Sequence, residues 1–194
     1  MSITINASAI LNNLTANNSY AFSSTKRIVK YNSDADETRQ SASSLKHKLR
    51  SLKDIDTSDG PTARTQNKIK SFVNTYNDLM SSASGITGSK KLTKYMDKMD
   101  SLFSEYEDSL KSLGITRTST NKLKFDTTNF SDVTSTKLDA VFGEDEHFVS
   151  DSIKYAKAIS SAAQQALIHQ RMYLEQPLFL YLPVIQPWLS LISS

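Results

Sequence analysis

The stretch "IKSFVNTYNDLMSSA", residues 69–83, decides the fold. Apolar or aromatic side chains recur in it at i, i+3, i+4, i+7, i+10, i+11 and i+14, counted from Ile69. This spacing places them along one stripe of an α-helix and leaves the polar residues on the opposite side. The stretch therefore predicts a helix that buries one face. The stripe consists of Ile69, Phe72, Val73, Tyr76, Leu79, Met80 and Ala83.

A second stretch repeats these intervals from Leu92 and continues to Leu113. Its stripe consists of Leu92, Tyr95, Met96, Met99, Leu102, Phe103, Tyr106, Leu110 and Leu113. The connector between the two stretches, "SGITGS", is short. A short connector between two amphipathic helices favours antiparallel neighbours. We therefore expect two adjacent helices whose stripes face each other.

A small hairpin is predicted after the second helix. Gly114 can adopt the left-handed conformation that closes a helix, and residues 115–118 and 122–125 alternate apolar and polar on either side of a tight turn. A hairpin of two strands is marginal in water. Ile115, Leu123 and Phe125 are therefore expected to lie on the helix pair.

Three further helices complete the prediction. One begins near Asp36, with Asp34 or Asp36 as its N-cap, and buries Ala42, Leu45, Leu49, Leu52 and Ile55. A short helix over residues 132–142 buries Val133, Leu138, Val141 and Phe142. A last helix follows Asp145 and carries Phe148, Val149, Ile153, Ala156, Ile159 or Ser160, Ala163 and Leu167. The predicted fold is mainly α, an antiparallel helix bundle with one small β-hairpin.

Composition divides the chain into three parts. Residues 1–35 are rich in Asn, Ser and Thr and carry no charge before Lys26, so they predict a polar, mobile arm with room for one short helix near residues 10–14. Residues 36–170 form the helical domain. Residues 171–194 form an apolar, proline-rich tail that contains three of the four prolines and the single Trp.

The tail leaves several interpretations open. It has no charged residue after Glu175 and no helical period, and Pro183 and Pro187 interrupt it. It could be an extended segment packed on a helical face, a partner-binding segment outside the fold, or the product of a shifted reading frame. Membrane attachment ranks below these, because the apolar run is short for a span.

Charge and cysteine content exclude several function classes. The net charge is only +3, and the basic residues alternate with acidic ones rather than forming a patch. A nucleic-acid partner is therefore not expected. The chain has no Cys, which rules out disulfides and thiolate chemistry. The first residues lack a basic segment followed by an apolar core, so no cleaved secretory signal is predicted.

No pattern in the chain points to catalysis, a cofactor or a metal. His47, His147 and His169 lie far apart in the sequence. The segment "DIDTSDG" resembles the start of a calcium loop, but Asp59 stands where that loop needs Gly and Thr65 where it needs Glu. We therefore expect a protein that is not an enzyme.

The candidate site residues are structural ones. Tyr76 is expected to be a core aromatic whose hydroxyl reaches the edge of the core. Asn77, beside the stripe, is expected to hydrogen-bond to the hairpin or a loop. The full set of core and turn residues is Phe72, Val73, Tyr76, Asn77, Leu79, Leu102, Phe103, Leu113, Gly114, Ile115, Leu123, Phe125, Val141 and Phe142.

The order of these segments resembles one known family. "IKSFVNTYNDLM", a second amphipathic helix, "LGI" at residues 113–115, "KLKFD" at 122–126 and "VFG" at 141–143 follow one another. This order is similar to the C-terminal helical part of the bacterial flagellar filament cap family, also called hook-associated protein 2. The resemblance covers residues 62–165. It implies that the hairpin braces the helix pair and performs no chemistry.

The resemblance also implies a function. It indicates a structural protein of the flagellum that associates with flagellin, hook-associated proteins or itself, and that leaves the cell by flagellar export without a cleaved signal. The alternative is a cytoplasmic helical module, a chaperone or regulator, that binds a flagellar subunit. The identity of the partner and the oligomeric state stay open.

The chain departs from the family in three ways. It is too short for the large outer β domains, and Asn121 stands where the hairpin turn usually has Gly. The terminal helices of the family's coiled coil are not recognisable, although "SSLKHKLRSLKDI" could stand for an N-terminal helix. A minimal cap-like protein, a truncated paralogue and a gene fragment are therefore all consistent with the sequence.

Overall fold

The computed structural model describes the backbone of residues 7–128 and 130–189, and the side chains of residues 19, 23–58, 60–128 and 130–170. The chain is mainly α-helical with one two-stranded hairpin, as the sequence predicts. The helices are α1 (Ala7–Lys53), α2 (Ala63–Ala83), α3 (Lys90–Glu105), α4 (Glu107–Ser112), α5 (Ser135–Phe142) and α6 (His147–Leu189). Short 3-10 turns lie at η1 (Thr57–Asp59) and η2 (Phe130–Asp132).

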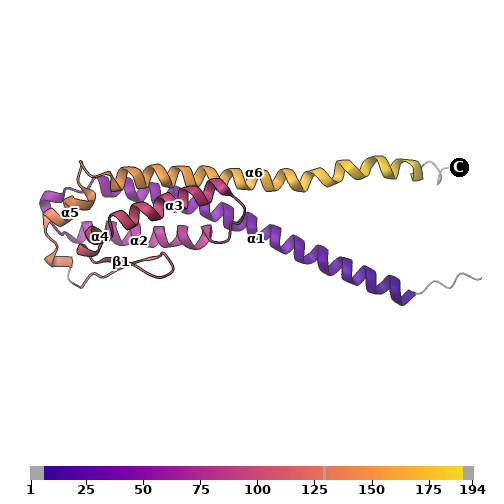
Figure 1. Cartoon of the computed structure of the whole chain (residues 1–194), viewed down its shortest axis with the longest axis horizontal. Helices are drawn as coiled ribbons and strands as arrows, with labels where there is room; N and C mark the ends of the chain where they lie inside the picture. Colours follow the sequence, from indigo (N-terminus) through magenta and orange to yellow (C-terminus); the bar gives the residue numbers. More distant parts are fainter. Residues whose placement is uncertain (1–6, 129, 190–194) are drawn as a thin grey trace, which may run out of the picture.

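Four helices form the bundle. The first and last helices, α1 and α6, pack along each other, α2 packs on α1, and α3 packs on α6 (Figure 1). Both α1 and α6 continue past the α2–α3 connection at the same end of the bundle and diverge there (Figure 1). The opposite end is closed by η1, α5 and the turn before α6.

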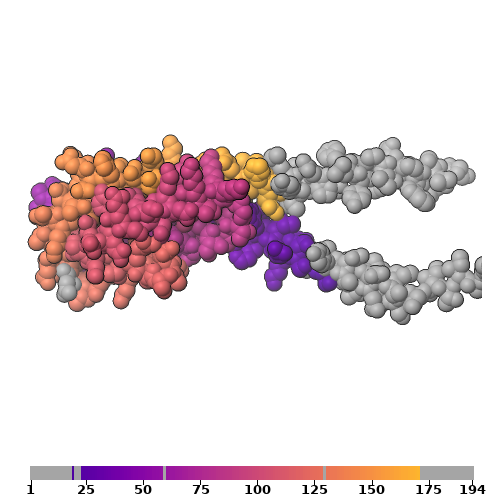
Figure 2. All heavy atoms as spheres, viewed as in Figure 1, coloured from indigo at the N-terminus to yellow at the C-terminus, as the bar shows by residue number. Residues whose placement is uncertain are grey.

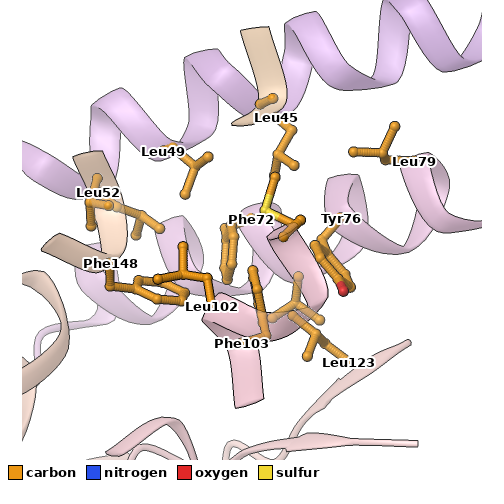
Figure 3. Packing of buried hydrophobic residues seen from close by; sticks show 14 of the residues in the cluster. Leu45, Leu49, Leu52, Phe72, Tyr76, Leu79, Leu102, Phe103, Leu123 and Phe148 are labelled. Carbon is orange, nitrogen blue, oxygen red and sulfur yellow. The ribbon is translucent and has the colours of Figure 1, made fainter. Parts of the chain in front are cut away.

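The core is continuous and rich in aromatic rings. Phe72 of α2 stacks on Phe103 of α3 with ring centroids 6.2 Å apart, and Phe103 lies 5.1 Å from Phe148 of α6. Leu45, Leu49 and Leu52 of α1 cover this cluster from the other side (Figure 3). Aromatic pairs in such offset or edge-to-face arrangements contribute more than their buried area alone.

The hairpin consists of β1 (Ile115–Arg117) and β2 (Leu123–Phe125). Ile115 pairs with Phe125 and Arg117 with Leu123 in antiparallel register. Ile115 and Leu123 are buried, and Phe125 is half-buried with its ring 5.6 Å from that of Phe130. The apolar side of the hairpin therefore lies on the helices, as expected for a hairpin that cannot stand alone.

Helix α1 corrects the prediction for residues 1–35. The structure shows one helix from Ala7 onward, where we expected an irregular arm, and Asp34 and Asp36 lie inside it rather than at its N-cap. Asp34 pairs with Lys30 and Asp36 with Arg39, each one helical turn away. Residues 1–59 contain neither Gly nor Pro, and extending an existing helix is much easier than starting one. The packed residues 35–52 thus provide an existing helix, and the residues that precede them extend it toward the N-terminus.

Helix α6 corrects the prediction for the tail. The backbone remains helical to Leu189, so residues 171–189 are neither extended nor irregular. Pro177, Pro183 and Pro187 are accommodated within this helix although each removes one backbone hydrogen bond. Leu, Met and Gln around them favour helix, and the segment extends a helix already anchored in the bundle. Long terminal helices are therefore present at both ends, contrary to the sequence reading.

The second predicted helix is divided in two. It ends as α3 at Glu105, and α4 begins after Tyr106, whose backbone departs from helical geometry at φ −97° and ψ 14°. The Tyr106 hydroxyl donates to Glu146 Oε2 at 2.9 Å, and its ring lies 5.2 Å from that of Phe148. These contacts draw the chain toward the start of α6. The apolar stripes of α2 and α3 do meet, through Phe72, Tyr76 and Phe103. The backbone of α2 nevertheless lies closer to α1, and the backbone of α3 lies closer to α6, than α2 and α3 lie to each other.

Candidate functional site

The structure places the expected core residues in one buried cluster. Tyr76 and Phe103 come closest among the rings, at 4.6 Å between centroids (Figure 3). The buried members of the expected set are Phe72, Val73, Tyr76, Leu79, Leu102, Phe103, Leu113, Ile115, Leu123, Val141 and Phe142. Phe125 is half-buried against the same cluster. These residues hold the hairpin and the short helices α4 and α5 on the bundle.

The hydroxyl of Tyr76 differs from the expectation. It does not reach solvent at the edge of the core, because the side chain is fully buried. In the described part of the chain its oxygen has no hydrogen-bond partner. Burial raises the pKa of the phenol, Arg117 opposes this rise and Asp100 adds to it. Ring packing therefore outweighs hydrogen bonding at this position.

Asn77 makes the contact with the hairpin that its position indicated. Its Nδ2 donates to Leu123 O at 2.8 Å, and Leu123 N donates to its Oδ1 at 2.7 Å. One side chain thus satisfies both backbone groups of Leu123 on the edge that faces α2. Unsatisfied backbone groups next to a core are costly, so this pair fixes the hairpin on α2.

Arg117 fixes the other strand to α3. Its guanidinium forms an ion pair with Asp100 and donates to Ser104 Oγ at 2.7 Å and to Asn121 Oδ1 at 3.0 Å. The Arg117 side chain is only 15% exposed, so water screens the pair less than at an open surface. Sequence reasoning missed this residue, because nothing in the spacing shows that Asp100 and Arg117 meet.

The two turn residues adopt the conformations that their types favour. Gly114 has φ +81°, closes α4 through a hydrogen bond to Lys111 O, and accepts at its own carbonyl from Asp126 N at 2.9 Å. A Cβ at Gly114 would lie 2.5 Å from Asp126 O, so a side chain cannot enter. Asn121 has φ +58° in the hairpin turn, where Asn tolerates the left-handed region.

The segment that resembled a calcium loop forms local turns instead. Asp56 Oδ1 accepts from Ser58 Oγ and Ser58 N, and these bonds lower the pKa of its carboxyl. Thr57 Oγ1 donates to Asp139 Oδ1 at 3.2 Å, which joins η1 to α5. Asp126 behaves alike, since Thr128 N and then Thr128 Oγ1 lower its carboxyl pKa.

The described residues contain no group of three or more His, Asp or Glu side chains placed to hold a metal ion. Within the same residues no helix is long and apolar enough to cross a membrane. The Arg117–Asp100 pair and Asn77 are the polar groups that fasten the hairpin to α3 and α2.

A hollow of about 580 Å³ lies where α1 and α6 diverge. We call it the fork. It is lined by Arg27, Lys30, Tyr31 and Asp34 of α1, by Gly85 of the α2–α3 connection and by Gln170 of α6. Lys30 Nζ binds Asp34 Oδ2 at 2.6 Å across one turn of α1. Because the sequence reading treated residues 1–35 as an irregular arm, it could not indicate this opening.

Comparisons with known proteins add no relative. No family model, no curated protein and no solved structure matches this chain.

Proposed function

We propose that this chain is a structural protein of the bacterial flagellum, of the filament cap or hook-associated kind, that acts by protein–protein association rather than catalysis. The observation that carries the proposal is the placement of α1 and α6. The first and last helices pack along each other and leave the bundle at the same end (Figure 1). A paired N- and C-terminal helix is what the resembled family uses to enter its filament.

The contact between α1 and α6 supports this role. Ala35 and Ala42 of α1 and Ala156 and Ala163 of α6 are all buried, so small side chains let the two backbones approach closely. Ser160 Oγ of α6 donates to Arg39 O of α1 at 3.2 Å. Helices α1 and α6 thus form a packed interface within the domain, and their outer ends project from it toward a partner.

The hairpin supports the proposal in a second way. Asn77 fastens it to α2 and Arg117 fastens it to α3. This is the bracing role that the family resemblance implies.

Secretion tests the proposal. In a flagellated bacterium that carries the gene, the full chain should be found in the culture supernatant and with isolated flagella. A deletion of residues 2–30 should keep it inside the cell, while the bundle from Tyr31 onward still folds. A Lys94→Ala variant, changed at an exposed bundle residue, should be exported as the full chain is.

Two results would overturn the proposal. Secretion that persists in a strain without the flagellar export apparatus excludes the flagellar route. Retention of the full chain in the cytoplasm of a normally flagellated strain, bound to a flagellar subunit, assigns it instead as a chaperone or regulator.

A further inference from the structure

The two ends of the bundle carry opposite charge. We call the closed end, formed by residues 54–60 and 132–146, the tip. The described side chains of the tip include one lysine, Lys137, and Lys68 of α2 reaches it with Nζ 3.4 Å from Asp54 O. Its carboxylates are more numerous: Asp54, Asp56, Asp132, Asp139, Glu144, Asp145 and Glu146. Residues 54–60 and 132–146 are brought together by the contact of η1 with α5. The acidic character of the tip is therefore a product of the fold.

The fork end is basic. Its described side chains in residues 23–35, 84–95 and 158–170 include one carboxylate, Asp34, which Lys30 already neutralises. The cations at this end are Lys26, Arg27, Lys30, Lys90, Lys91 and Lys94, and all of them are exposed.

The first turn of α3 strengthens the positive potential at the fork end. It holds Lys90 and Lys91 and no acidic residue. The N-terminus of a helix is the positive end of its macrodipole and normally favours carboxylates. Two lysines there oppose that preference, so carboxylates from another molecule would be bound favourably. Val29 and Ile168, exposed by 63% and 48%, also lie near this end and leave apolar surface beside the charges.

The tip presents its carboxylates on a rigid turn. Gly143 N donates to Asp139 O at 2.8 Å, and Glu146 N donates to Gly143 O at 3.2 Å. Glu146 is further held by the Tyr106 hydroxyl. Glu144 and Asp145, between these fixed points, are exposed. A turn ordered before binding loses little entropy when it docks.

We propose that the tip of one copy docks at the fork of a second copy, with Glu144 and Asp145 against the basic side chains of the fork end, of which Arg27 and Lys30 line the hollow. Figure 2 shows α1 in indigo and α6 in yellow at this end of the bundle, beside the α2–α3 connection. The hollow of about 580 Å³ admits a short turn such as residues 143–146. Such a contact joins unlike surfaces, so it leaves a free tip and a free fork and extends into a row of copies.

This contact goes beyond the proposed function and is tested separately from it, because the measurement uses the purified full chain and no flagellum. Sedimentation velocity at rising protein concentration should show reversible association at low salt. The association should be lost near 1 M salt, where the screening length falls from about 30 Å at 0.01 M to about 3 Å. A chain that is monomeric throughout at low salt, or an association that salt does not weaken, overturns the proposal.

Charge reversal gives the sharper test. A tip variant (Glu144→Lys and Asp145→Lys) and a fork variant (Lys26→Glu and Arg27→Glu) should each stay monomeric. An equimolar mixture should associate, because the intact tip of the fork variant meets the intact fork of the tip variant. Complementation of this kind shows that the tip of one copy contacts the fork of another, and growth of the unchanged chain beyond a dimer distinguishes a row of copies from a closed pair.

Controls carry single charge reversals of the same kind elsewhere. Asp78→Lys and Lys48→Glu lie on exposed bundle positions outside both ends and should associate as the unchanged chain does. Circular dichroism checks that every variant is folded. Folded variants that both associate normally, or a mixture that stays monomeric, overturn the proposal.

Discussion

The amide of Asn77 serves Leu123 as a neighbouring strand would. It accepts from the Leu123 N–H at 2.7 Å and donates to the Leu123 carbonyl at 2.8 Å. The edge of β2 that faces α2 is thereby satisfied by a helix side chain. Asn77 thereby fixes the position of β2 on α2, as Arg117 fixes that of β1 on α3.

Replacing Asn77 with Ala should lower the free energy of unfolding by about 2–3 kcal/mol, because the N–H and C=O of buried Leu123 both lose their partner. Chemical denaturation measures the change. Asp78→Ala, at the exposed neighbouring position, serves as the control and should stay within about 0.5 kcal/mol of the unchanged chain. Equal effects of the two substitutions would show that the Asn77 bonds contribute nothing.

Tyr76→Phe should be neutral or stabilising by up to about 1 kcal/mol. The substitution removes a buried hydroxyl without a partner in the described chain and keeps the ring contacts with Phe72 and Phe103. Tyr76→Ala, which removes the ring as well, should cost about 3–5 kcal/mol. A clear loss of stability in Tyr76→Phe would mean that the hydroxyl is bonded in solution.

Alkaline pH should destabilise the chain through the same residue. Burial raises the pKa of Tyr76 above the ordinary tyrosine value of about 10, so at high pH the unfolded chain releases a proton that the folded chain keeps. The free energy of unfolding therefore falls as pH rises above about 10, because the folded state binds more protons than the unfolded state. The stability of Tyr76→Phe, followed by denaturant titration across this range, should fall less steeply than that of the unchanged chain. Parallel curves for the two proteins contradict this assignment.

Gly114→Ala should cost more than Gly88→Ala. Both glycines have φ +81°, so both substitutions carry the strain of a left-handed non-glycine residue, about 1–2 kcal/mol. At Gly114 the new Cβ also meets Asp126 O at 2.5 Å, whereas nothing lies within 4 Å at Gly88. The difference in unfolding free energy between the two variants therefore measures the backbone contact. Identical values would show that β1 and Asp126 separate without cost.

Phe72→Ala should destabilise by about 3–5 kcal/mol and Leu102→Ala by about 2–5 kcal/mol, because both side chains are buried in the common core. Lys94→Ala, on the exposed side of α3, should be close to neutral. Thermal or urea denaturation of the three variants checks this. If the lysine variant lost as much stability as the others, α3 would be packed by a different face.

Periodicity predicted the parts of the fold whose apolar spacing is unambiguous. The stripes from Ile69 and Leu92, the left-handed Gly114 and the hairpin all follow from the pattern, because burial and backbone sterics act locally there. The pattern failed where contacts with another element determine where a helix begins or ends. Residues 7–35 have weak apolar spacing, yet α1 continues through them because nothing in them ends a helix. Tyr106, at which α3 ends, bonds Glu146, forty residues later in the chain.

The residues that fasten the hairpin divide in the same way, into one that the local pattern indicated and one that depends on contacts between distant segments. The position of Asn77 beside the stripe indicated a bond to the hairpin, since a helix face fixes direction. Arg117 with Asp100 was not predictable, because their meeting depends on how the hairpin folds back over α3. The fork and the tip depend on contacts between segments distant in the sequence, so their charges cannot be grouped before the fold is known.

The shared exit of α1 and α6 has a mechanical consequence. A load that pulls the two terminal helices apart acts across their contact and opens it one helical turn after another, starting at the fork. A load that pulls both helices in the same direction, away from the tip, leaves their mutual contact unloaded and instead shears the packing of α1 on α2 and of α6 on α3 along its whole length. The domain should therefore yield at low force when its ends are drawn apart and resist a much higher force when both ends are held together and the tip is pulled.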